Sequence, residues 1–175
     1  MIKQFRVFIP VVILALTALF VLACGSASDA TNSGTAATGT VAAPRSAAHF
    51  KVGDQVKIGS TWLITVNSAQ TNAGDAVSQP NQGNTYVVVD LTMKNLSSQE
   101  QDVSSLLQFT FKDATGQKYD EALTDIGQSP DGKVAAGDLL RGQLVYEVST
   151  AQHQFTLAFE NDIISSGQTI WDISI

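Results

Sequence analysis

Residues 85–95 read TYVVVDLTMKN, and this stretch decides the fold of the chain. Every second residue along part of it is apolar, at Val87, Val89, Leu91 and Met93. Successive side chains of a β-strand point to opposite faces, so this period of two predicts a strand with one buried face.

Seven further segments between residues 49 and 175 combine this period with flanking turn residues, and each predicts a strand. They are residues 54–58; 62–70, with Trp62, Ile64 and Val66 inward; 105–112, with Leu107, Phe109 and Phe111 inward; 117–120; 140–148, with Leu144, Tyr146 and Val148 inward; 154–160, with Phe155, Leu157 and Phe159 inward; and 169–175, with Trp171, Ile173 and Ile175 inward. Residues 113–116 predict a tight hairpin, because Gly116 can adopt positive φ. Residues 120–136 contain two glycines and a proline, which leave room for at most one short helical turn.

Eight short strands with one apolar face each predict an all-β domain over residues 49–175, two antiparallel sheets packed face to face. An up-and-down barrel is the alternative. Trp62 and Trp171 are interpreted as core residues because of their places in the alternation. Cys24 is the single cysteine and precedes the domain, so no intrachain disulfide stabilises it.

The N-terminal segment is typical of a secretory signal peptide: Lys3 and Arg6 precede an apolar run over residues 7–23. Residues 21–25 read VLACG, which resembles the lipobox of bacterial lipoproteins, in which a small residue precedes a cysteine that is lipidated. We therefore predict a lipoprotein signal peptide at residues 1–23 and lipidation of Cys24. The alternative is an uncleaved signal anchor, since a run of about 17 apolar residues is at the short limit of a membrane span.

Residues 24–48 follow as a predicted flexible linker rich in Ala, Ser, Thr and Gly, without the apolar residues needed for a core. Such a tether spans about 25–30 Å. Cleavage of the signal removes Lys3 and Arg6 and leaves 8 basic residues against 16 acidic ones, a net charge of −8. Because anionic headgroups repel such a chain, the lipid must provide the attachment at the extracytoplasmic face of the cell membrane.

Four stretches of the domain carry a resemblance to a known family: FKVGDQVKIG from Phe50, YVVVDLTMKNLSSQE from Tyr86, FKDATGQKY from Phe111 and AAGDLLRGQLVYEV from Ala135. Together they resemble a telokin-like domain-of-unknown-function family found in bacterial lipoproteins and secreted proteins. The resemblance implies an immunoglobulin-like sandwich over most of residues 50–175. The family has no assigned chemistry, so the resemblance adds no catalytic residue.

The composition argues against several function classes. With 16 acidic and 10 basic residues, the chain is not expected to bind nucleic acid. His49 and His153 lie outside any nucleophile motif, and the sequence has no phosphate-binding glycine loop or HExxH, so we expect no enzyme activity and no cofactor. Asn95 begins a glycosylation triplet, which is expected by chance in a bacterial chain.

One acidic surface is predicted from the strand order. If the strands alternate in direction, one pole of the domain collects Glu100, Asp102, Asp120, Glu121, Asp125, Asp131, Asp138 and Asp162, and this pole faces away from the tether. Asp125, Asp131 and Asp138 are the predicted ligand-binding residues there, for a basic partner or for Ca²⁺, although a solvated cluster that only keeps the domain soluble is the alternative. The leading function is a non-enzymatic interaction or scaffold module of the cell envelope with a protein or envelope-component partner. A cation or small-ligand binding protein is second, and a hydrolase is third.

Overall fold

The computed structural model describes residues 47–161 and 167–175. The predicted signal peptide, Cys24, nearly all of the predicted linker and Asp162 lie outside the described residues. Within the described part of the chain, no helix is both long and apolar enough to span a membrane.

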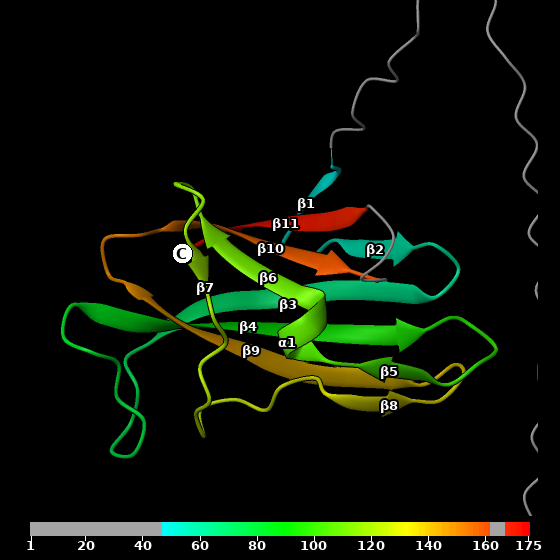
Figure 1. The fold of residues 1–175 in the computed structure, drawn as a ribbon, viewed down its shortest axis with the longest axis horizontal. Helices are drawn as coiled ribbons and strands as arrows, with labels where there is room; N and C mark the ends of the chain where they lie inside the picture. The colour runs from blue at the N-terminus through cyan, green and yellow to red at the C-terminus, as the bar shows by residue number, and fades with distance from the viewer. Residues whose placement is uncertain (1–46, 162–166) are drawn as a thin grey trace, which may run out of the picture. The chain divides into compact units, whose positions relative to one another are not determined.

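Most of the described chain is in two sheets (Figure 1). The five-stranded sheet has the order β1-β11-β10-β6-β7, and the four-stranded sheet has the order β2-β3-β4-β9. The strands are β1 (His49–Lys51), β2 (Gln55–Ile58), β3 (Trp62–Asn72), β4 (Asn84–Asn95), β5 (Gln101–Val103), β6 (Phe109–Asp113), β7 (Lys118–Tyr119), β8 (Gly132–Val134), β9 (Leu139–Ser149), β10 (Gln154–Glu160) and β11 (Gln168–Ser174). One short helix, α1 (Ser105–Gln108), precedes β6.

The core lies between the two sheets and is made mainly of predicted inward residues. Val87, Val89, Leu91 and Met93 of β4 are all fully buried, and they join one apolar cluster with residues from β6, β10 and β11 of the other sheet. The two predicted core tryptophans, Trp62 and Trp171, are also fully buried. The prediction of an all-β sandwich is therefore confirmed. The barrel alternative is wrong, because the edge strands of the described sheets do not pair with each other.

The start of one predicted strand is wrong. Residues 105–108 form α1 rather than the beginning of a strand, and Leu107, predicted to point inward, is 66% exposed. The backbone N–H of Ser105 donates a hydrogen bond to a carboxylate oxygen of Asp131 at 2.6 Å, which holds the first residue of the helix in place. Phe109 and Phe111 follow in β6 and are buried as predicted.

Three short strands were not predicted. β1 pairs with β11 in parallel, with His49 opposite Ile170, so the strands do not simply alternate in direction. β5 and β8 pair as a separate two-stranded sheet, and β8 occupies part of the segment for which the sequence allowed a helical turn. Each of these strands has only three residues, too few for an apolar period to be visible.

Asn95, the last residue of β4, is fully buried and joins three segments. Its side-chain N–H groups donate to the carbonyl oxygens of Gln99 at 2.7 Å, Val134 at 2.9 Å and Ala135 at 3.2 Å. Its side-chain oxygen accepts from both the backbone N–H and the hydroxyl of Ser97. The glycosylation triplet that begins at Asn95 is therefore a structural feature, since its amide nitrogen is buried and fully engaged.

We predict that Asn95→Ala lowers the free energy of unfolding by about 3 kcal/mol or more, because it leaves the buried carbonyl of Val134 without its partner and removes the four other hydrogen bonds of a fully buried side chain. Asn67→Ala is the matched control. Asn67 is exposed, and its side chain bonds only to Asp90 and Thr92, so this variant should lose less than about 1 kcal/mol. Chemical denaturation of both variants measures the difference, and equal losses would contradict the role assigned to Asn95.

Candidate functional site

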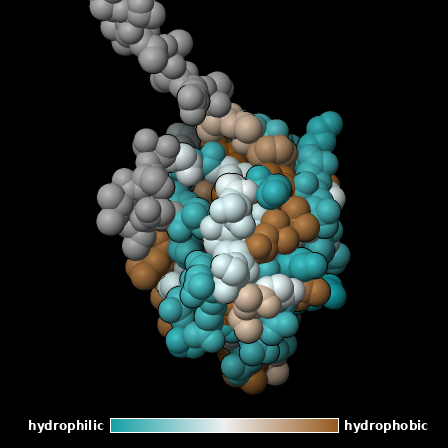
Figure 2. All heavy atoms as spheres, turned by 90° about the vertical axis from the view of Figure 1, so that its right-hand side faces the viewer, coloured by the Kyte–Doolittle hydropathy of each residue, from teal (hydrophilic) through white to brown (hydrophobic). Residues whose placement is uncertain are grey.

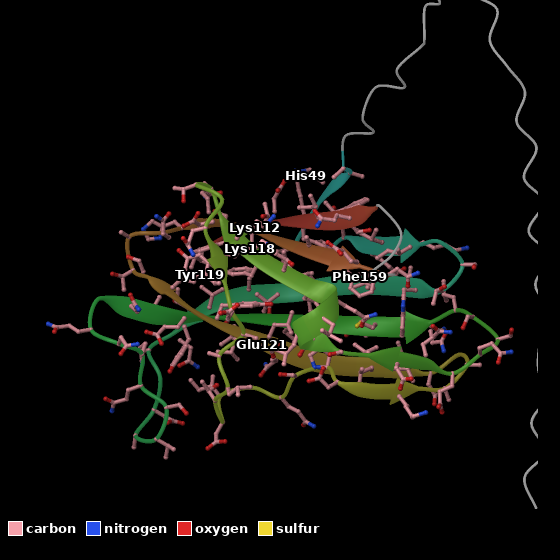
Figure 3. The ribbon with its side chains drawn as sticks, in the orientation of Figure 1. His49, Lys112, Lys118, Tyr119, Glu121 and Phe159 are labelled. Atoms are coloured by element: carbon pink, nitrogen blue, oxygen red, sulfur yellow. The ribbon has the colours of Figure 1, made fainter. Side chains whose placement is uncertain are left out.

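The candidate site is a pocket of ≈ 270 Å³, here called the α1 pocket, between α1, the β6–β7 edge and β9. It is lined by Ser105, Leu106, Phe109, Thr110, Lys118, Tyr119, Asp120, Glu121 and Tyr146. Figure 3 labels Lys118, Tyr119 and Glu121, which lie along β7 and the chain that leaves it. The pocket therefore forms where the regular sandwich is interrupted by a helix on one side and a short edge strand on the other.

Stacked aromatic rings fix the pocket wall. The ring of Tyr146 lies flat on Phe111, with ring centroids 4.2 Å apart and planes 7° apart. Phe111 also stacks on Phe155, and the Tyr119 ring meets both of these phenylalanine rings edge-on. Because these contacts lock both tyrosine rings, the pocket presents two aromatic side chains in fixed orientations.

Asp113 holds the end of β6 and the hydroxyl of Tyr119. One of its carboxylate oxygens accepts hydrogen bonds from the hydroxyl and N–H of Thr115 and from the N–H of Gln117, and the other accepts from the Tyr119 hydroxyl at 2.9 Å. The hydrogen bond from the Thr115 hydroxyl, together with the others, holds the pKa of Asp113 below its usual value. Burial, with the hydrogen bond to Asp113, raises the pKa of Tyr119. The predicted hairpin at residues 113–116 is confirmed, with Gly116 at φ 89°.

Glu121 is the least satisfied polar side chain of the pocket. Its Oε1 accepts a hydrogen bond from the Ser129 hydroxyl, whereas its Oε2 is buried and has no hydrogen-bond partner among the described residues. The backbone of Glu121 pairs with Tyr146 as an isolated bridge. Burial, and then the charge of Glu121, raise the pKa of Tyr146, so the phenol remains protonated.

The opposite wall of the pocket is α1, held by Asp131. The Asp131 carboxylate accepts hydrogen bonds from both the N–H and the hydroxyl of Ser105. The next two side chains of the helix are open to solvent, with Leu106 65% and Leu107 66% exposed. Exposed leucines beside a pocket are typical of a contact surface for another molecule.

The three predicted ligand-binding residues are separated by the fold. Residues 122 and 128 bond to Val145 and Gln143 in the middle of β9, so Asp125 lies beside that strand. Asp131 precedes β8 and holds α1, whereas Asp138 follows β8 in the connection to β9. The expectation that these residues share one pole is therefore wrong for Asp125. Whether any of the three binds a ligand stays a prediction.

The remaining acidic residues of that pole do not gather around a common point. Lys133 Nζ donates a hydrogen bond to Glu100 Oε1 at 2.7 Å, and this bond, followed by the charge of Asp102, raises the pKa of Lys133. Within residues 47–161 and 167–175, no three His, Cys, Asp or Glu side chains are grouped so that they could hold a metal ion. Figure 2 looks onto this end of the domain, where hydrophilic residues predominate and hydrophobic residues lie between them in separate groups.

The predicted point at which the chain enters the domain is also wrong. β1 runs parallel to β11 and begins opposite Ile170, near the end of β11 that follows the 161–167 connection. The described chain therefore enters the domain at the end that was predicted to face away from the tether (Figure 1). His49 lies at this entry point and contacts β11, with its Nδ1 2.7 Å from a carboxylate oxygen of Asp172.

The sequence missed Tyr119, Glu121 and Tyr146 as site residues. Tyr146 was interpreted as a core residue, which it also is, at 3% exposure. Glu121 was counted as one acidic residue of a loop, and no sequence pattern marks it as the one whose carboxylate is buried beside two tyrosines. These residues come together through the pairing of Glu121 with Tyr146 and through the Phe111 ring, which contacts both tyrosines.

We predict that the contribution of Asp113 to the stability of the domain is lost at acidic pH. Its pKa in the folded state lies below the usual value of 3.8, so its contribution is full above that value and is lost as the pH falls through the lowered folded-state pKa. The stability advantage of the wild type over Asp113→Asn should therefore be constant near pH 6 and should narrow below about pH 4. Denaturation midpoints across this range measure it, with the exposed Asp125→Asn as control. A stability difference between the wild type and Asp113→Asn that does not change with pH would contradict the prediction.

Solved structures similar to this chain are β-sandwiches of bacterial origin. An uncharacterized β-sandwich protein from Clostridium difficile has a TM-score of 0.53 at 14% identity, over 74% of this chain and 95% of that one. The secreted protein MPT63 of Mycobacterium tuberculosis has a TM-score of 0.54 at 11% identity, over 75% of this chain and all of that one. The ycdA protein of Bacillus subtilis, a predicted lipoprotein, has a TM-score of 0.57 at 11% identity, over 71% of this chain and 39% of that one. At these identities the likeness shows the fold.

The sequence itself identifies the family. No curated protein sequence matches the chain. A family model does match: the one described as a domain of unknown function, DUF4352, covers residues 50–170, which is most of the chain. The resemblance to a domain-of-unknown-function family is thus confirmed, and the chain belongs to the DUF4352 family.

Proposed function

We propose that this protein is a non-enzymatic binding module of the bacterial cell envelope, held at the extracytoplasmic face of the membrane through a lipid on Cys24. In this proposal the domain binds a protein partner at the α1 pocket and at the exposed leucines beside it. The tether of residues 24–48 lets the domain reorient and reach its partner.

The observation that carries the proposal is the composition of the α1 pocket. It combines fixed aromatic rings, a buried carboxylate oxygen without a partner and two exposed leucines of α1 in one place. Aromatic and apolar anchors around a few polar groups are typical of binding surfaces.

The proposed location is supported by the N-terminal sequence and by the relatives. Cys24 follows an apolar run and a small residue, as in lipoproteins. Among the structural neighbours, one is a predicted lipoprotein and another is a secreted protein. A stable anchor requires more than one acyl chain, because a single chain gives only marginal membrane binding.

We predict that Cys24→Ser abolishes incorporation of labelled fatty acid into the protein. No label should remain in the Cys24→Ser chain, because the sequence contains no other cysteine that could accept a lipid. Metabolic labelling of cells that express the wild type and the variant measures the effect. Normal labelling of the Cys24→Ser chain would refute the lipid anchor.

We predict that a photo-crosslinking residue at position 106 forms one discrete adduct with a partner in intact cells. Leu106 lines the α1 pocket and is 65% exposed. The same residue at position 77 is the control, because Val77 is 80% exposed but lies on the β3–β4 connection, outside the pocket lining. Filling the pocket with Thr110→Trp should remove the adduct from position 106. Equal adducts from both positions, or an adduct that survives Thr110→Trp, would contradict the proposal.

A further inference from the structure

Glu121 Oε2 has no hydrogen-bond donor among the described residues, and this indicates which chemical group a ligand of the α1 pocket would bring. An ionised carboxylate accepts up to about four hydrogen bonds, and it is costly to bury one of its oxygens without a donor. The Ser129 hydroxyl reaches only Oε1. An N–H group brought by another molecule would give Oε2 the donor that the described chain does not supply.

The charges around the pocket favour a cation in this role. Two carboxylates, those of Asp120 and Glu121, and one ammonium, that of Lys118, line it. Lys118 is exposed and takes part in none of the ion pairs found among the described residues, so it does not neutralise Glu121. The chain as a whole carries a net charge of −6, which attracts basic partners from a distance.

The walls of the pocket suit the same ligand. The faces of aromatic rings attract cations, and Phe109, Tyr119 and Tyr146 all line the space. The side chain of Leu106 lies at the rim and can contact the methylene groups of a long side chain. A volume of ≈ 270 Å³ is small for a drug-sized ligand and is closer to the size of one side chain.

We propose that the α1 pocket binds the cationic head of a lysine or arginine side chain of the partner, with Glu121 Oε2 accepting its hydrogen bond. This inference rests on the proposed function, because it names the partner group that the same pocket recognises. Glu121 Oε2 is buried in the unbound structure, so the Glu121 side chain must rotate before Oε2 can contact a ligand. Side-chain rotations of this kind are common at interfaces.

The test is an NMR titration of the ¹⁵N-labelled domain with N-acetyl-lysine methylamide and N-acetyl-arginine methylamide, and with N-acetyl-norleucine methylamide as the neutral analogue. The lysine or the arginine probe should produce saturable shifts at Leu106, Tyr119 and Glu121. The norleucine probe should bind at least tenfold more weakly. Equal binding of the charged and neutral probes, or shifts that never saturate, would overturn the inference.

Variants separate the pocket carboxylate from overall charge. Glu121→Gln should weaken binding of the charged probes at least tenfold, whereas Asp54→Asn removes the same charge at an exposed position outside the pocket lining and should leave the affinity unchanged. Lys118→Glu, at an exposed position, should tighten binding, and this gain remains measurable even if Glu121→Gln fails to fold. Equal losses in the Glu121 and Asp54 variants, or no gain from Lys118→Glu, would overturn the inference.

The titration and the crosslinking report on different claims. If the adduct at position 106 forms but the charged probes bind no more tightly than the norleucine probe, the proposal of a cationic ligand is wrong. The proposal that α1 and its pocket form a binding surface is then still supported. If the adduct itself is absent, the proposed function is wrong whatever the probes do.

Discussion

The stacking of Phe111 on Tyr146 ties the two sheets of this domain together, and the candidate site depends on it. Phe111 belongs to β6 of the five-stranded sheet and Tyr146 to β9 of the four-stranded sheet, with ring centroids 4.2 Å apart. No disulfide within the domain links the two sheets, because the single cysteine of the chain, Cys24, lies in the N-terminal segment. Tyr146 also pairs through its backbone with Glu121, so the contact that closes the core also places the pocket carboxylate.

The segment between β7 and β8 protects an edge of the sandwich and supplies pocket residues at the same time. Ala122 donates to the carbonyl of Val145 and Gln143 donates to the carbonyl of Gln128, which satisfies part of the outer edge of β9. The approach is close, since a Cβ at Gly142 would lie 2.6 Å from the backbone nitrogen of Pro130. Covering an edge strand in this way prevents pairing with other chains, and it fixes Glu121 and Asp131 without regular secondary structure.

The α1 pocket lies where the domain departs from a regular sandwich. A four-residue helix replaces the first part of a strand, a two-residue strand ends the five-stranded sheet, and an irregular segment follows. Departures from regular structure reduce the stability of a fold, and the rest of the core must compensate for the loss. Proteins therefore tend to keep such departures at positions that serve a function. Here the buried apolar cluster between the two sheets supplies the stability of the domain. Leu106 and Leu107 of α1 stay outside this cluster and are exposed.

The sequence by itself determined eight of the eleven described strands and most of their buried faces, because a period of two needs only the local pleat of the chain and water on one side. It determined much less of the site. Asp131 looked like a surface ligand residue but holds α1, and Glu121 looked like its acidic neighbours but lies beside two tyrosines. The pairing of β1 with β11, of β5 with β8 and of Glu121 with Tyr146 was decided only by the tertiary structure. Such contacts join short segments that are far apart in the chain, and their stability comes from burial against the assembled core rather than from any local preference.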